Sequence, residues 1–220
     1  MSCNKITLSH LRASNWGVGY KKLIKIYKGT FSPIITYGFP AWSKHLTKEQ
    51  TRTLLAAQRS VAIRCSKGYR TTSLPAFLVI ARMVKITDHI ELTRIRYHHK
   101  KSKPCTIGTV EFNPQTPIKE KIKQLRTMQL QTWQEERKHE SRGRITFKYF
   151  PNLVNRLDAI WFVPDYYTSQ LISGHGNIRS KLNQLQLADS DLCDCGLPET
   201  VEHTIFECPA HVIPRESLRD

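Results

Sequence analysis

The sequence predicts a mainly α-helical chain that ends in a small module built around three cysteines and one histidine. Two observations lead to this fold class. Apolar residues recur at steps of three and four along several segments, which is the spacing of an amphipathic helix. Near the end of the chain, Cys193, Cys195, His203 and Cys208 have the spacing of metal ligands. With 40% apolar residues among 220, the chain can also form packed cores.

Three helices are expected in the first part of the chain. The first carries a continuous apolar stripe and ends near Gly38. The second begins at Thr47, which forms a capping box with Gln50. The third is capped by Ser73 and continues with basic residues as far as Lys103. Together these helices predict a bundle.

Four more helices of different lengths are expected in the second part of the chain. Their ranges are Ile118 to about Glu140, Leu153 to Trp161, Tyr166 to Ser173, and Ile178 to Leu187. Ser141-Arg142-Gly143-Arg144 breaks the first of these, and Gly174-His175-Gly176 ends the third with a turn.

These elements divide the chain into four expected regions. Residues 1–103 form a basic helical region that contains the bundle of residues 14–100. Residues 104–117 hold two prolines, a glycine and short β-branched pieces, so they predict a boundary or linker. Residues 118–187 form a second helical region, and residues 188–213 form the metal-binding module.

The formal net charge of +16 is concentrated in the first region. More than half of the 34 lysines and arginines precede residue 104, where Glu49, Asp88 and Glu91 are the only acids. This excess favours a polyanion partner, most commonly DNA or RNA, although solvated helix faces are the alternative interpretation. An anionic membrane surface is the weaker interpretation, since no basic amphipathic segment has an anchor beside it. The residues expected to contact nucleic acid are Lys21, Lys22, Lys25, Lys28, Arg59, Arg64, Lys67 and Arg70.

The sequence indicates an intracellular protein with no membrane partner. It lacks an apolar run of about 18 residues, and Met1 to Lys28 lack the features of a secretory signal. Three of the six cysteines have metal-ligand spacing, which favours a reduced compartment over a disulfide framework. Nothing in the sequence predicts an oligomeric state.

The pattern C-x-C-x7-H-x4-C predicts a structural zinc site. Three thiolates and an imidazole complete the tetrahedron of Zn²⁺ and leave no position open for water. Gly196 allows the tight turn that such a knuckle needs, and the module is too small to fold without metal. The alternatives are that the four residues lie together by chance at a buried helix end, or that His211 replaces a ligand.

Further motifs near the end of the chain are Gly174-His175-Gly176, Leu187-Ala188-Asp189-Ser190, Cys193-x-Cys195-Gly196, Glu199-Thr200, His203 and Cys208-Pro209. In their order and spacing they resemble the C-terminal end of non-LTR retrotransposon polyproteins. Upstream, further motifs resemble the segment that follows the polymerase palm in the same family. These are Trp16-Gly17, Tyr27, Pro33-Ile34, Tyr37-Gly38, Trp42, Gln58-Arg59 and Tyr69-Arg70-Thr71-Thr72-Ser73. The similarity spans nearly the whole chain and is greatest to the arthropod clade that inserts into ribosomal RNA genes.

The resemblance implies a parent polyprotein with an apurinic-type endonuclease, a reverse transcriptase, a basic region and a zinc knuckle. The parent would nick target DNA and extend the nick on its own RNA in the nucleus, with Mg²⁺ serving its polymerase and nuclease. This chain would correspond to the thumb side of the polymerase and the whole region after it, and Met1 need not be the natural start. Since the family's Ala-Asp-Asp sequence is absent, we expect no polymerase (nucleotidyltransferase) activity and assign no catalytic residue.

Two other functions stay open from the sequence. One is a stand-alone zinc-dependent nucleic-acid-binding protein. The other is an endonuclease in the C-terminal half, although the acids of residues 104–165 lack the alternating strands of a ribonuclease H fold. A restriction-type signature would need an acid-x-Lys after Pro164-Asp165, and here Glu136-Arg137-Lys138 comes before it.

Isolated histidine, tryptophan and cysteine residues have structural and functional interpretations. His175 is expected to make a backbone hydrogen bond in a helix-stop turn, in preference to a catalytic role. The tryptophans could stack on nucleobases, but we expect them in the core. They are Trp16, Trp42, Trp133 and Trp161. The cysteines expected to be unligated are Cys3, Cys65 and Cys105.

Overall fold

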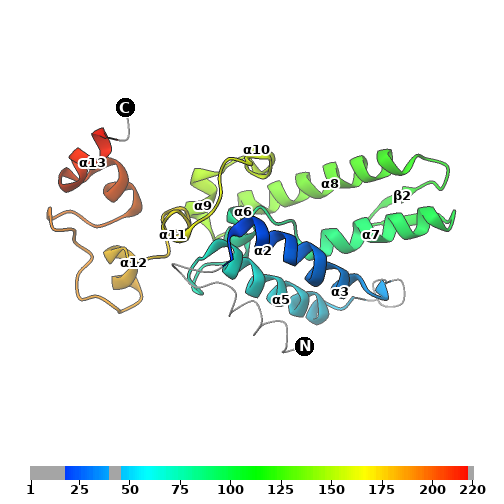
Figure 1. Ribbon diagram of the computed structural model, residues 1–220, viewed down its shortest axis with the longest axis horizontal. Helices are drawn as coiled ribbons and strands as arrows, with labels where there is room; N and C mark the ends of the chain where they lie inside the picture. The colour runs from blue at the N-terminus through cyan, green and yellow to red at the C-terminus, as the bar shows by residue number, and fades with distance from the viewer. Residues whose placement is uncertain (1–17, 40–45, 218–220) are drawn as a thin grey trace.

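The computed structural model describes residues 18 to 39 and 46 to 217. Figure 1 shows a helical body from which the long helices α7 (Ile86–Lys100) and α8 (Ile118–His139) extend to one end of the molecule, while the C-terminal module lies at the other end. The expected mainly α fold is confirmed, because two short strands form the only sheet in the described part of the chain. No helix within that part is both long and apolar enough to cross a membrane.

The first expected helix is continuous but changes its winding. It consists of α2 (Tyr20–Ile26), the π-helical turn η1 (Tyr27–Phe31) and α3 (Ser32–Thr36). Pro33 lacks a backbone N–H and its ring collides with the carbonyl four residues earlier, so we attribute the wider π turn before it to this proline. Leu23 and Tyr27 are buried on one side, and Gly38, in the left-handed region at φ +65°, follows the end of the helix.

The capping box expected at Thr47 is present at the start of α5 (Lys48–Ser66). The Gln50 N–H donates to the Thr47 hydroxyl at 3.2 Å, and the Thr47 N–H donates to the Gln50 side-chain carbonyl at 2.9 Å. These bonds satisfy two donors that a helix start leaves without partners. The helix ends at Lys67, whose φ of 56° turns the chain away.

The single helix expected from Ser73 to Lys103 is instead two helices, α6 (Leu74–Ile80) and α7. The buried side chain of Gln58 holds the turn between them, because its amide N–H donates to the Val84 carbonyl at 2.7 Å and its carbonyl accepts from the Ile86 N–H at 3.0 Å. Ser73 occupies the N-cap position, but its side chain makes no capping bond. Helix α6 itself ends locally, where Arg82 has a left-handed φ of 48° and the Met83 N–H donates to the Leu78 carbonyl at 2.8 Å. The contact from Gln58 then fixes the start of α7.

Part of the expected linker of residues 104–117 folds as a β-hairpin. Strands β1 (Cys105–Ile107) and β2 (Val110–Phe112) pair antiparallel, with Ile107 opposite Val110, and Gly108 supplies the positive φ of the turn. Its inward residues pack with Leu92 and Ile95 of α7 and Leu125 of α8. The segment predicted as a boundary or linker thus contains a packed hairpin, because alternating apolar side chains give it a face that the two helices bury.

The main core crosses the boundary that the sequence suggested. Leu23, Val61 and Phe77 from the first part pack in one cluster with Trp133 of α8 and Leu153 of α10 (Leu153–Asp158). Residues on both sides of the hairpin therefore share a hydrophobic core.

Arg156 connects α10 to α6 and is only 1% exposed. Its guanidinium donates to the Ile80 carbonyl at 2.6 Å and lies 5.0 Å and 4.5 Å from the ring centroids of Phe150 and Phe162. Burial lowers the pKa of this side chain to about 10. One of the chain's positive charges therefore lies in the core and does not contribute to the surface.

The remaining helices lead to the C-terminal module. A helix not expected from the sequence, α9 (Arg144–Tyr149), precedes α10, which ends at Asp158 and not at Trp161. Helix α11 (Tyr166–Ser173) has the expected bounds and ends at Gly174, whose φ is +67°. Helix α12 (Arg179–Gln184) is shorter than expected. The chain finishes in η3 (His203–Glu207), η4 (Pro209–His211) and α13 (Val212–Glu216).

Candidate metal centre and basic surface

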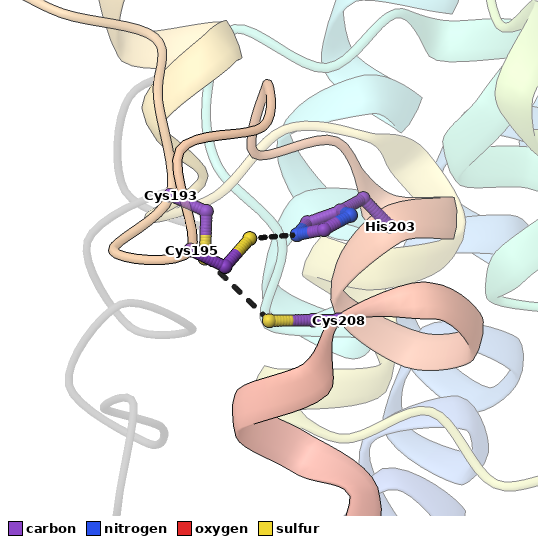
Figure 2. Close-up of side chains that lie close together, drawn as sticks. All are labelled: Cys193, Cys195, His203 and Cys208. Carbon is purple, nitrogen blue, oxygen red and sulfur yellow. Dashed lines mark hydrogen bonds between the residues drawn. The ribbon is translucent and has the colours of Figure 1, made fainter.

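The Cys-x-Cys segment forms a tight reversal of the chain. The Cys193 N–H donates to the Leu197 carbonyl at 2.7 Å, and the Gly196 N–H donates to the Cys193 carbonyl at 2.9 Å. Gly196 has a φ of +86°, so the turn expected at this glycine is confirmed. Figure 2 shows the thiols of Cys193 and Cys195 directed toward the other two residues of the cluster.

His203 and Cys208 flank a single π-helical turn. His203 begins η3, and the Cys208 N–H closes the turn on the His203 carbonyl at 2.7 Å. The Thr200 hydroxyl accepts the His203 N–H at 3.1 Å, which fixes the start of the turn. Both ligand candidates are buried, at 3% and 0% exposure, beside Val201. The local hydrogen bonds therefore hold the imidazole and the thiol in place.

The four side chains converge with metal-site geometry. The sulfurs of Cys193 and Cys208 are 3.6 Å apart, and the Cys195 sulfur is 3.1 Å from Nε2 of His203. All four donor atoms lie within 4.8 Å of one another. A tetrahedron with zinc–sulfur bonds of about 2.3 Å has sulfur–sulfur edges of about 3.8 Å. The group can therefore hold a metal ion with little rearrangement, and it does not include His211.

Electrostatics favour a thiolate at Cys193. The backbone N–H of Cys195 lowers the pKa of the Cys193 thiol to about 7, and His203 adds to this shift. Burial raises the pKa of the Cys208 thiol. Soft thiolates and a neutral imidazole are the ligands that Zn²⁺ takes in structural sites, so the donor set fits this ion.

Arg179 of α12 braces the knuckle, a role that the sequence did not indicate. It donates to the Leu192 carbonyl at 2.8 Å and forms ion pairs with Asp194 at 2.7 Å and Glu199 at 3.3 Å. Asp194 lies between the two cysteines, and Leu192 and Glu199 lie before and after the Cys-x-Cys turn. No local signal pairs Arg179 with them, because the contacts span 13 to 20 residues.

The basic residues expected to contact nucleic acid fall into two groups. Lys21, Lys22, Lys25 and Lys28 are exposed along α2 and η1. The others gather around the loop between α5 and α6, where Arg70 is exposed while Arg59, Arg64 and Lys67 are half-buried. Among the described residues, no ion pair to a carboxylate involves any lysine of the first group.

Arg59 was expected to contact nucleic acid, but its side chain is half-buried and binds the protein backbone. Its guanidinium donates to the carbonyls of Arg70 and Thr72, the latter at 2.7 Å, and lies over the ring of Phe77. Arg64 donates to the Ser60 carbonyl at 2.6 Å, and burial together with Arg70 lowers its pKa. Arg59 therefore shapes the loop from beneath, which leaves Arg70 as its outward cation.

The tryptophans and the cysteines outside the metal cluster lie in different environments. Trp133 is a core residue as expected, whereas Trp161 is 80% exposed, so the core prediction was wrong there. The reason is that α10 ends before Trp161, which leaves the indole on a surface loop. Trp16 and Trp42 lie outside the described residues, as does Cys3. Cys65 and Cys105 lie in hydrophobic cores.

His175 and Asp165 have structural partners. His175 follows the helix-stop Gly174 as expected, but its ring contacts the Thr71 hydroxyl at 3.0 Å instead of a backbone group. The Asp165 carboxylate accepts the N–H groups of Tyr167 and Thr168 at 2.8 and 2.9 Å, so it caps α11. In residues 18–39 and 46–217, the Cys₃His cluster is the only group of three or more potential metal ligands.

Comparisons with known proteins point to one family. A Pol polyprotein from the type-1 retrotransposable element R1 4 of Nasonia vitripennis is 33% identical over 96% of this chain and 54% of its own length. The putative 115 kDa protein of element R1DM from Drosophila melanogaster is 26% identical over 97% of the chain and 21% of its own length. The R1 Pol polyprotein of Bradysia coprophila is also 26% identical, over 97% of the chain and 21% of its own length.

The chain thus spans about half the length of the first relative and about one fifth of the length of the other two. No family model matches it, and no solved structure does. The similarity nevertheless covers both the helical body and the Cys₃His module, in agreement with the resemblance seen in the sequence motifs. The comparisons therefore support a fragment of R1 type from a non-LTR retrotransposon, because over nearly its whole length the chain is similar to part of these Pol polyproteins.

Proposed function

We propose that this chain is a nucleic-acid-binding part of a retrotransposon RNA-directed DNA polymerase and endonuclease polyprotein. In this role it holds the element transcript and the target DNA during target-primed reverse transcription in the nucleus. The relatives supply the polyprotein context through their names, and the residues of this chain supply the two binding elements. We assign no catalytic step to it.

The first element is the module of residues 188–213, stabilised by a structural zinc ion. Cys193, Cys195, His203 and Cys208 would hold the ion, which would supply a rigid cross-link and no reactive position. Apart from the ligands, Val201 is the only buried residue described in this module. So small a core cannot stabilise the fold alone, which is why metal binding and folding should be coupled.

The second element is the basic surface, and one observation carries this proposal. The exposed lysines of α2 and η1 lie on a single helix with no acid in its first turn and no carboxylate ion-pair partner among the residues described. Unpaired cations on one face attract a polyanion, and binding releases the counterions condensed on nucleic acid. The affinity should therefore depend on salt and little on sequence.

Salt titrations of duplex DNA binding test this proposal. In the variant with Lys21→Gln and Lys25→Gln, the slope of log affinity against log salt should fall by about 0.9 for each phosphate that is no longer neutralised, or roughly 2 for the pair. A matched variant with Lys119→Gln and Lys123→Gln removes the same charge from exposed positions of α8. An equal change in both variants would show that only the total charge matters and would contradict the proposal.

A further inference from the structure

The end of α5 and the loop that follows it form three hydrogen bonds with α11 and the turn after it. Each contact joins a residue of positions 66–71 to one of positions 166–175. The pairs are the Ser169 hydroxyl with the Ser66 carbonyl, the Tyr69 and Tyr166 hydroxyls at 2.8 Å, and the Thr71 hydroxyl with His175 Nδ1 at 3.0 Å. Figure 1 shows α11 beside α6 and the end of α5. The loop and the start of α11 therefore form one continuous surface.

The backbone of this loop has little freedom to move. A β-carbon on Gly68 would come within 2.4 Å of the Phe77 ring, so the chain here passes directly over α6. Arg59 holds the next part of the loop from beneath through the Arg70 and Thr72 carbonyls. A surface that is ordered before binding loses less conformational entropy when a ligand arrives.

Aromatic rings gather on this surface where solvent reaches them. Tyr167 is 70% exposed and Tyr69 is 40% exposed. Their rings flank that of Tyr166, with centroids 6.1 Å from Tyr69 and 5.2 Å from Tyr167. Since adjoining tyrosines could bury more area by turning inward, an exposed group of this kind marks an interaction surface.

Positive charge borders the tyrosines. Arg70 follows Tyr69 directly and is exposed, and it lies close enough to Arg64 to lower the pKa of that side chain. Neither arginine takes part in an ion pair with a carboxylate in the described part of the chain. Cations beside exposed aromatic faces match a ligand that presents phosphates and flat rings together.

We propose that Tyr69, Tyr166 and Tyr167, together with Arg64 and Arg70, form a binding surface for single-stranded nucleic acid. Bases stack on the exposed faces of Tyr167 and Tyr69, and the backbone phosphates lie against the arginines. A duplex keeps its bases inside the stack and offers these rings only its backbone, so the surface discriminates by strandedness. The proposal rests on the nucleic-acid-binding function above and assigns one class of strand to one part of the molecule.

The test uses the full chain and two fluorescent probes, a single strand of about 12 nucleotides and the duplex of the same sequence. Tyr167→Ala should weaken single-strand binding roughly tenfold, because one stacked base is lost, and should leave the salt slope unchanged. Arg70→Gln should lower the single-strand salt slope by about 0.7. Tyr167→Ala should bind the duplex as the parent does, because a duplex keeps its bases inside the stack. Tyr37→Ala, which changes an 87% exposed tyrosine at the end of α3, is the matched control and should bind both probes normally.

Several outcomes would overturn the inference. If Tyr167→Ala and Tyr69→Ala both bind the single strand as tightly as the parent, the tyrosines do not stack on bases. If Tyr37→Ala weakens binding as much as Tyr167→Ala, the effect is not local to this surface. These results would leave the proposed function intact, since the duplex would still bind. Failure of the parent chain to bind either probe would instead overturn both proposals together.

Discussion

Replacement of Gly174 by alanine should destabilise the helical body through two separable effects. Gly174 ends α11 with a φ of +67°, and a β-carbon there would lie 2.1 Å from Cδ1 of Ile145 and 3.2 Å from its Cγ1. A side chain in the left-handed region costs about 1 to 2 kcal/mol. Forcing α9 to accommodate the extra methyl group adds about 1 to 3 kcal/mol, and the lower part of that range applies because the tip of Ile145 can rotate. We expect a total loss of about 2 to 4 kcal/mol.

Gly108→Ala is the control that separates these effects. Gly108 has a φ of +59° in the hairpin turn, but nothing lies within 4 Å of its added β-carbon. It should therefore show only the backbone cost of about 1 to 2 kcal/mol. Urea unfolding followed by far-ultraviolet circular dichroism measures both variants. Equal losses in the two would refute the packing argument and leave backbone conformation as the whole effect.

Two further substitutions test buried polar groups by the same unfolding assay. Gln58→Leu should cost about 2 to 4 kcal/mol, because it leaves the Val84 carbonyl and the Ile86 N–H without partners, and a neutral result would refute the role given to Gln58. Burial raises the pKa of Asp88 from 3.8 to about 6, so the carboxyl disfavours folding when ionised. Asp88→Asn should thus raise stability by up to about 3 kcal/mol above pH 6, with the gain fading to nothing as pH falls below about 4. A gain that grew toward acidic pH would contradict this sign.

Local signals in the sequence predicted helix ends well wherever the cap is made by neighbouring residues. The Thr47 and Gln50 capping box and the stop at Gly174 are both formed within a few residues of the helix end. The break between α6 and α7 was missed because it needs a left-handed backbone at Arg82, which is not a glycine, and a contact from Gln58, which is far away in the chain. The hairpin at 105–112 was missed for a similar reason, since its strands are short and only their packing on α7 and α8 stabilises them.

The metal cluster could be predicted from the sequence because its ligands lie within a short segment and their chemistry restricts the spacing. The exposed basic residues could be predicted only in part. A count of charges cannot separate Lys21, which is exposed, from Arg156, which lies in the core, or from Arg59, which holds a loop. The pairing of Tyr69 with Tyr166 spans 97 residues and has no signature in either local sequence.

Zinc content of the purified chain, measured by native mass spectrometry, tests most directly the claim that the Cys₃His cluster is a structural metal centre. We expect one zinc ion per chain, lost in Cys195→Ser and retained in Cys3→Ser, which changes a cysteine expected to be unligated. A chain without zinc, or equal zinc in the parent and in Cys195→Ser, would contradict the ligand assignment.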